Sequence, residues 1–192
     1  MTDLAWESLG LDDVVALLDD FPARWWIAGG RALELFVGRP IREHEDIDVL
    51  VLRSEQLAVQ RHLRGWDLRV AHEGRLEPWQ VGERLELPRH SLWARRDPEA
   101  SWQIQFLLGE DARGVWRYRR DPSVTLPVAE LGLLSLEGVP FVRPELILLF
   151  KAKEPRQRDE TDLQAVLPAL DAAARSRLRD WLPSEHPWLR RL

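Results

Sequence analysis

Two stretches decide the fold of this chain, Trp25-Trp26-Ile27-Ala28-Gly29-Gly30-Arg31-Ala32 and His44-Glu45-Asp46-Ile47-Asp48-Val49-Leu50-Val51. In the first, an apolar run ends in two glycines and leads into a segment whose apolar residues have helical spacing. In the second, another apolar run begins with two carboxylates. The pattern predicts a buried strand over 25–28, a helix over 31–37 that ends at Gly38, and a second buried strand over 47–52.

The two carboxylates of the second stretch, Asp46 and Asp48, are spaced i, i+2. On a strand this spacing directs both side chains to one side of the sheet and turns Ile47 into the core. Two adjacent anions repel each other, and a divalent cation offsets that repulsion. Because Mg²⁺ prefers hard oxygen ligands and glycine turns approach phosphates closely, the pattern predicts a magnesium–phosphate site. The alternatives are solvated aspartates at a strand entrance and, for Gly29 and Gly30, an ordinary strand-to-helix turn.

The bulk composition excludes several classes of protein. The 192 residues are 45% hydrophobic and 31% charged, which is ordinary for a globular protein, and the net charge of −5 argues against a nucleic-acid partner. Cysteine is absent, which excludes disulfides and thiolate metal sites. No apolar run approaches the roughly 20 residues that span a bilayer, and no signal-peptide pattern opens the chain. We therefore expect a cytoplasmic protein with no membrane partner.

The rest of the chain divides into a strand-rich middle and a helical end. The predicted fold class is α+β, a mixed β-sheet flanked by helices over 1–140, followed by a C-terminal helical subdomain over 141–192 that packs on it. Further predicted elements are a helix over 11–20, a helix with Ser54 as N-cap that runs to Arg64, a strand over 66–70, a hairpin of 92–95 with 102–108, and helices over 144–151, 159–167 and 171–181.

With its strand, Gly-Gly, helix and Asp-x-Asp in this order, the chain resembles the nucleotidyltransferase superfamily, which has the DNA polymerase β-like fold. It is most similar to the branch of aminoglycoside and lincosamide nucleotidyltransferases. The resemblance covers 24–53 and, through a helical stretch, 143–168. Both motifs at this spacing are more specific than either alone.

The resemblance implies Mg²⁺-dependent transfer of a nucleoside monophosphate from a nucleoside triphosphate to a hydroxyl group of a small, aminoglycoside- or lincosamide-like molecule. Asp46 and Asp48 would then be both catalytic residues and metal ligands. The residues expected to bind the triphosphate are Gly29, Gly30, Arg31, Arg42 and Lys151.

Several of these residues have alternative roles. Arg31 occupies a position at which many members of the superfamily carry serine or threonine. Its side chain either contacts a phosphate or lies on the surface. Lys151 either reaches phosphates or pairs with Asp159 and Asp162. We expect His44 to be a structural hydrogen-bonding residue whose pKa the nearby anions raise. We expect the four arginines between 113 and 120 to form a solvated face, with binding of an acidic partner as the alternative; they are Arg113, Arg117, Arg119 and Arg120.

The chain lacks one carboxylate that the resemblance leads us to expect at the catalytic site. Active members of the superfamily usually add a third carboxylate from a neighbouring strand, but the strand predicted over 102–108 carries Gln103 and Gln105 on that face. Glutamine ligates Mg²⁺ weakly and does not activate an alcohol as a carboxylate does. The conceivable substitutes are Glu83, Glu86 and Glu110.

A third carboxylate within reach of Asp46 and Asp48 would favour the enzyme. Its absence would favour a catalytically degenerate relative that binds a nucleotide or a protein partner. A toxin-type nucleotidyltransferase that acts on RNA or protein is a further alternative. The sequence fixes neither the acceptor, the nucleotide nor the oligomeric state.

Overall fold

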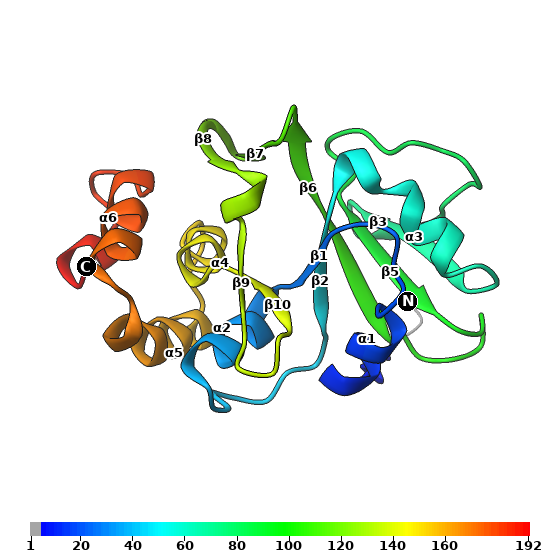
Figure 1. The fold of residues 1–192 in the computed structure, drawn as a ribbon, viewed down its shortest axis with the longest axis horizontal. Coiled ribbons are helices and arrows are strands. Elements are labelled where there is room, and N and C mark those ends of the chain that lie inside the picture. The colour runs from blue at the N-terminus through cyan, green and yellow to red at the C-terminus, as the bar shows by residue number, and fades with distance from the viewer. Residues whose placement is uncertain (1–4) are drawn as a thin grey trace.

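A mixed sheet of ten strands forms the centre of the protein in a computed structural model that describes residues 5–192 (Figure 1). The strands of the main path follow the order β4-β3-β5-β6-β2-β1-β10-β9, and β7 and β8 extend from β6 as a hairpin. Helices α2, α4, α5 and α6 gather on the side of β9 and β10, whereas α1 and α3 lie on the side of β3 and β5. The predicted fold class, a mixed sheet flanked by helices, is confirmed.

The helices are α1 (Leu11–Leu17), α2 (Gly29–Val37), α3 (Leu57–His62), α4 (Pro144–Lys151), α5 (Gln157–Val166) and α6 (Ala172–Trp181). The strands are β1 (Trp25–Ile27), β2 (Asp48–Leu52), β3 (Asp67–His72), β4 (Arg75–Pro78), β5 (Ser91–Arg95), β6 (Ile104–Ala112), β7 (Val115–Tyr118), β8 (Asp121–Pro127), β9 (Gly132–Leu134) and β10 (Pro140–Val142). Short 3-10 segments are η1 (Arg53–Glu55), η2 (Val128–Glu130), η3 (Leu167–Ala169) and η4 (Pro187–Arg190).

The predicted strand–helix–strand unit is present as β1, α2 and β2. Strands β1 and β2 are antiparallel, with Trp25 opposite Val51. The helix begins at Gly29 and ends where Gly38, with a φ of 68°, adopts the left-handed conformation that closes many helices. Ile47 is 1% exposed, which confirms that it turns into the core.

Strand β6 positions the middle of the chain beside this unit. It runs parallel to β2, with Gln105 as the partner of Asp48, and antiparallel to β5. The pairing of β5 with β6 confirms the predicted hairpin of 92–95 with 102–108. The other end of β6 turns back into β7, so the β7–β8 hairpin grows out of the strand that adjoins Asp48.

The C-terminal helices pack against α2 through α4 and α5. Helix α4 begins with Pro144 at its first turn, as predicted, and buries Leu146 and Leu148 completely. Helix α5 begins at Gln157 rather than at Asp159, because the Asp159 carboxylate accepts a hydrogen bond from the backbone N–H of Arg156 at 3.0 Å and caps the helix from its first turn.

The predicted helix start at Ser54 is wrong. Ser54 does not cap a helix; it lies in η1, and α3 begins at Leu57. The reason is a tertiary contact, since the backbone N–H and hydroxyl of Ser54 both donate to the Asp111 carboxylate, at 3.0 and 2.7 Å. Over residues 5–192, the structure contains no helix with the length and apolar character needed to cross a membrane. The division into 1–140 and 141–192 stays a prediction.

Candidate functional site

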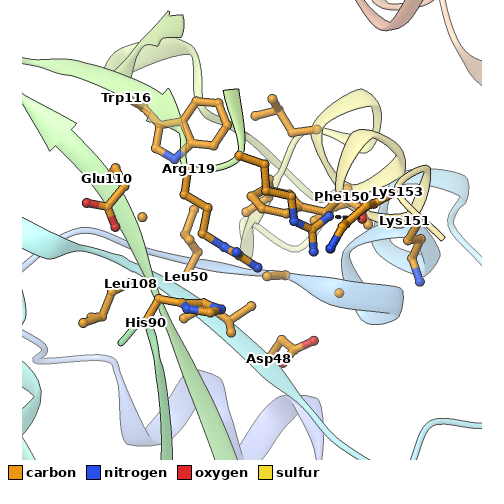
Figure 2. A pocket seen from close by; sticks show the side chains of 18 of the residues that line it. Asp48, Leu50, His90, Leu108, Glu110, Trp116, Arg119, Phe150, Lys151 and Lys153 are labelled. Carbon is orange, nitrogen blue, oxygen red and sulfur yellow. Dashed lines mark hydrogen bonds between the residues drawn. The ribbon is translucent and has the colours of Figure 1, made fainter. Parts of the chain in front are cut away.

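A cavity of about 770 Å³ lies where β2, β6, α4 and the β7–β8 hairpin meet (Figure 2). Residues from three predicted site positions line it together, namely Gly29, Asp48 and Lys151. Its apolar wall includes Leu50, Leu107, Trp116, Ile147 and Phe150. Its charged rim comprises Asp48, Glu110, Arg117, Arg119, Arg120, Lys151, Lys153, Glu154, Arg156 and Asp159.

Gly29 and Asp48 touch each other at the N-terminus of α2. Gly29 has a φ of 59°, which side chains other than glycine rarely adopt. A Cβ atom at this position would overlap the Oδ2 atom of Asp48. The backbone N–H of Ala28 also donates to the backbone carbonyl of Asp48, at 2.8 Å. The helix N-terminus and the carboxylate are therefore held in contact, and only glycine fits between them.

The Asp48 carboxylate has an unfavourable electrostatic environment. Burial and the neighbouring Asp46 carboxylate raise the pKa of Asp48 to about 7, against the opposite effect of Lys151 and Arg158. A bound cation would relieve this repulsion, because positive charge favours the ionised form of a carboxyl.

Asp46 lies next to Asp48 but outside the strand. Strand β2 begins at Asp48, so Asp46 precedes the strand, but its carboxylate still acts on that of Asp48. Asp46 is exposed and lines a second cavity of about 540 Å³ together with Arg31. The Arg31 guanidinium is 3.0 Å from the Glu34 carboxylate. The carboxylate pair thus stands between two cavities, with Asp48 facing the larger one.

Lys151 lines the large cavity and is held by two aspartates. Its ammonium nitrogen is 2.9 Å from Asp159 Oδ1 and 2.9 Å from Asp162 Oδ2, which is the pairing named as its alternative role. Arg42 also binds Asp162, at 3.0 and 3.2 Å through two guanidinium nitrogens, and does not line the large cavity. The two cations thus join the loop before β2 to α4 and α5. Their predicted contact with a triphosphate stays a prediction.

Gly30 lies against the loop before β2. A Cβ atom here would meet the Arg42 guanidinium at 2.7 Å and would overlap the His44 ring. Burial, with the nearby Arg42 and Arg31, lowers the pKa of His44 although Glu34 lies 3.0 Å away. The expected rise in that pKa is therefore wrong, because the ring is desolvated and faces cations as well as anions.

Within the described part of the chain, no third carboxylate joins Asp46 and Asp48. Gln105 occupies the strand position beside Asp48, and its amide donates to the Ser91 hydroxyl at 2.8 Å. The Gln103 oxygen accepts from the backbone N–H of Arg96 at 3.0 Å. Among residues 5–192, no three side chains of His, Cys, Asp or Glu are grouped so that they could hold a metal ion.

The three proposed substitutes do not fill the gap. Glu110 lines the cavity, but its carboxylate accepts from Arg53 Nε at 2.7 Å. Glu83 pairs with Arg89 at 2.8 Å. Glu86 is exposed and does not line the cavity.

The residues present fit one Mg²⁺ ion bound together with phosphates. Such ions usually keep several waters and take only one or two carboxylates from the protein, which Asp46 and Asp48 would supply. Burial and the Asp46 carboxylate raise the pKa of Asp48, and a bound cation would lower it again. A second ion dedicated to the acceptor hydroxyl would need a further carboxylate, and the pair does not offer one.

The arginine run contributes to the cavity, which the sequence prediction did not foresee. Arg113, Arg117 and Arg120 are exposed, as expected for a solvated face, and Arg119 is half-buried. Arg117, Arg119 and Arg120 also line the cavity. Tyr118 and Asp121 pair across the β7–β8 hairpin, so Arg119 and Arg120 form its turn. The alternation of aromatic and charged residues from Trp116 to Arg119 is the signal in the sequence that could have indicated this hairpin.

Comparison with known proteins identifies the fold. Residues 10–75 match the family of aminoglycoside-2''-adenylyltransferases. The lincosamide antibiotic adenylyltransferase LnuA, solved with lincomycin bound, superposes with a TM-score of 0.58 at 16% identity, covering 83% of this chain and 96% of that chain. The crystal structure of ANT(2'')-Ia in complex with adenylyl-2''-tobramycin superposes with a TM-score of 0.55 at 18% identity, covering 89% of this chain and 94% of that chain.

The solution structure of ANT(2'')-Ia also superposes, with a TM-score of 0.54 at 15% identity, covering 89% of this chain and 86% of that chain. No curated protein is significantly similar to this chain in sequence. At such identities the superpositions establish the fold, and the sequence match adds the family of the N-terminal third. The predicted resemblance is thereby confirmed: this chain has the fold of the nucleotidyltransferases, and residues 10–75 carry the pattern of their aminoglycoside branch.

Proposed function

We propose that this protein transfers a nucleoside monophosphate from a nucleoside triphosphate to a hydroxyl group of a small molecule, with Mg²⁺ as cofactor. One observation carries the proposal: Gly29, Asp48 and Lys151, which are far apart in the sequence, line a single cavity. They combine a helix N-terminus, a carboxylate and a cation, which are the groups that bind a metal-complexed polyphosphate.

Each residue has a defined task in this reaction. Gly29 lets the N-terminus of α2 approach the phosphates, since it presents no Cβ atom. Asp46 and Asp48 would hold Mg²⁺, which when bound neutralises charge on the phosphates. The Lys151 ammonium would offset further phosphate charge from the α4 side of the cavity. The acceptor oxygen attacks the α-phosphorus in line, the bond to the bridging oxygen breaks, and pyrophosphate leaves.

The proposed acceptor is an aminoglycoside- or lincosamide-like molecule. The two superposed relatives were solved with adenylyl-2''-tobramycin and with lincomycin, and this chain covers more than nine tenths of each. The apolar wall formed by Leu50, Ile147 and Phe150 suits a ligand with apolar as well as polar surface.

A second candidate function is nucleotide binding without transfer. Gln105 favours it, because this residue occupies the strand position next to Asp48 and its amide is engaged by Ser91. A neutral amide does not draw a proton from an acceptor hydroxyl as a carboxylate does. The two candidates share the triphosphate site and differ only in the reaction.

Pyrophosphate release distinguishes them. Wild-type protein, Asp46→Ala and Asp48→Asn are each incubated with Mg²⁺, each of the four nucleoside triphosphates labelled at the α-phosphate, and a pool of aminoglycosides and lincosamides. Transfer predicts acceptor-dependent pyrophosphate release and a labelled acceptor with wild-type protein and neither product with the variants. Triphosphate binding by wild-type protein without release would exclude transfer to these acceptors and support the second candidate.

A further inference from the structure

We propose that Arg119, in the turn of the β7–β8 hairpin, binds the phosphates of the triphosphate in the large cavity. This inference rests on the proposed function and adds to it a residue outside the motifs of the resemblance. In this proposal the β7–β8 hairpin contributes a phosphate ligand from the side of the cavity opposite the Gly29–Asp48 contact.

The hairpin geometry directs Arg119 into the cavity. Tyr118 and Asp121 form the last pair of the hairpin, so only Arg119 and Arg120 lie in its turn. Figure 2 shows the Arg119 side chain pointing into the cavity, toward the side on which His90 and Asp48 lie. Both residues line the same cavity as Arg119.

Of the five other cations at the cavity rim, Arg117 on β7 is exposed, and the remaining four are already engaged. Arg120 donates to the backbone carbonyl of Phe150 at 2.8 Å. Lys151 and Arg156 both bind Asp159, each at 2.9 Å. Lys153 pairs with Glu154 at 3.6 Å.

The Arg119 guanidinium differs from these four groups in having no hydrogen-bond or ion-pair partner among the described residues. Over residues 5–192 it makes no hydrogen bond within 3.5 Å and no ion pair within 4.0 Å, and its side chain is only partly exposed. Glu110 is the acidic residue that acts on it most, but its carboxylate is bound to Arg53. A half-buried guanidinium with five unused donors is a binding site for an anion, and its planar fork matches phosphate oxygens.

The surroundings keep this guanidinium charged and poorly solvated. Burial and the neighbouring Arg120 lower the pKa of Arg119, whereas Tyr118 and Glu110 act in the opposite direction. An arginine stays protonated despite such a shift, because its ordinary pKa lies above 12. A phosphate would therefore relieve repulsion within the turn in addition to forming hydrogen bonds.

A purely structural role for Arg119 predicts a different result. Its guanidinium carbon lies 5.7 Å from the centre of the Phe150 ring, so it could serve only to pack on that ring. Removing a packing contact would lower the stability of the protein and leave the affinity for phosphate unchanged. Stability and affinity must therefore both be measured.

Calorimetric titration in the presence of Mg²⁺ tests the proposal. The probes are α,β-methylene analogues of the four nucleoside triphosphates, inorganic tripolyphosphate, and the corresponding nucleosides. The proteins are wild type, Arg119→Gln, Arg119→Lys and the control Arg113→Gln, which removes the same charge from the neighbouring β6–β7 turn outside the cavity lining. Thermal unfolding shows that each variant is folded.

We expect Arg119→Gln to weaken binding of tripolyphosphate and of the preferred analogue by about tenfold or more, the usual effect of losing charged hydrogen bonds. Arg119→Lys should lose less affinity for these phosphates than Arg119→Gln does, and the affinity of both variants for nucleosides should not change. Arg113→Gln should bind tripolyphosphate and the analogue with an affinity within about twofold of that of wild type. Equal affinity of wild type and Arg119→Gln would overturn the inference and leave the proposed function standing. Wild-type protein that binds no triphosphate analogue would overturn both.

Discussion

At the scale of single residues, the contact between Gly29 and Asp48 joins the backbone of the first motif to the carboxylate of the second. The glycine has both a positive φ and a neighbour that leaves no room for a side chain. Gly38, at the other end of the same helix, has a φ of 68° but no heavy atom within 4 Å of the position of an added Cβ among the described residues. Substitutions at the two glycines therefore distinguish the effect of backbone strain from the effect of close approach to Asp48.

We predict that Gly29→Ala lowers stability by more than Gly38→Ala. A left-handed conformation costs an alanine about 1–2 kcal/mol at either position, and the overlap with Asp48 adds to this cost only at Gly29. Urea unfolding of both variants measures the difference in the free energy of unfolding.

Triphosphate binding gives the second comparison between these glycines. Gly38→Ala should bind a triphosphate as wild type does, whereas Gly29→Ala should lose binding because the alanine displaces the Asp48 carboxylate. Equal stability and equal affinity of the two variants would show that the close approach has no role in the site.

Gln105 occupies the strand position beside Asp48, where a carboxylate would favour the proposed transfer. We predict that Gln105→Asp raises the rate of pyrophosphate release by at least about tenfold, because a carboxylate beside Asp48 supplies the missing metal ligand and base. The lost hydrogen bond to Ser91 should cost about 1 kcal/mol of stability. Steady-state assays with labelled triphosphate measure the rate.

Gln103→Asp is the control for this change, since it adds the same charge two residues earlier, outside β6. A rise in rate that is equal in both variants would assign the effect to net charge rather than to a position next to Asp48.

At the scale of elements, α4 and α5 form the cationic side of the cavity through a buried ionic network. Asp159 is 1% exposed and binds both Lys151 and Arg156. Burial alone would raise the pKa of Asp159, but the hydrogen bonds from Arg156 and Lys151 hold it well below its ordinary value. A carboxyl with a lowered pKa in the folded state stabilises that state above its unfolded pKa and loses this contribution as the pH falls.

We predict that Asp159→Asn lowers stability at pH 7 by roughly 3 kcal/mol, the cost of removing one member of a buried ion pair. The difference from wild type should shrink as the pH falls below about 4, where wild-type Asp159 also begins to lose its advantage over the unfolded state. Urea unfolding at a series of pH values measures this difference in stability.

The control Glu154→Gln changes an exposed ion pair with Lys153 and should change stability by less than about 0.5 kcal/mol. A deficit for Asp159→Asn that is the same at pH 3 and pH 7 would contradict this account.

The sequence predicted those elements whose signal is local. Strand β1, helix α2 and helix α4 follow from apolar runs bounded by Gly29, Gly38 and Pro144. The start of α3 was missed because the bonds of Ser54 go to Asp111, which is distant in sequence. Propensity carries no information about such a tertiary contact.

The site could be predicted only in part, because it too depends on contacts between residues that are distant in sequence. Gly29 and Asp48 meet because adjoining strands bring them together, as the motif order indicated. Arg119 could not be placed, because its direction depends on the two-residue turn between β7 and β8 and on how that hairpin leans over α4. For Lys151 the sequence named both roles, and only the structure shows the two aspartates at 2.9 Å.

At the scale of the whole molecule, the cavity needs both parts of the chain. Its lining runs from Ala28 to Asp159 and includes strands of the sheet as well as α4 and the segment that follows it. If 1–140 and 141–192 are separate subdomains, as the sequence predicts, the triphosphate would bind between them. Domain junctions are a common place for ligand sites, since each side supplies groups that the other lacks.

We propose that this cavity binds a nucleoside triphosphate together with Mg²⁺ through Asp48. Calorimetric titration of wild-type protein with each triphosphate, with Mg²⁺ or with EDTA, measures this binding. Asp48→Asn is compared with the control Asp20→Asn, which changes a side chain that is 90% exposed.

We predict that wild type and Asp20→Asn bind at least one triphosphate with a dissociation constant below about 1 mM. Both EDTA and Asp48→Asn should weaken that binding by at least about tenfold. Wild-type protein that binds no triphosphate, or Asp48→Asn protein that binds as tightly as wild type with Mg²⁺ present, would contradict this proposal.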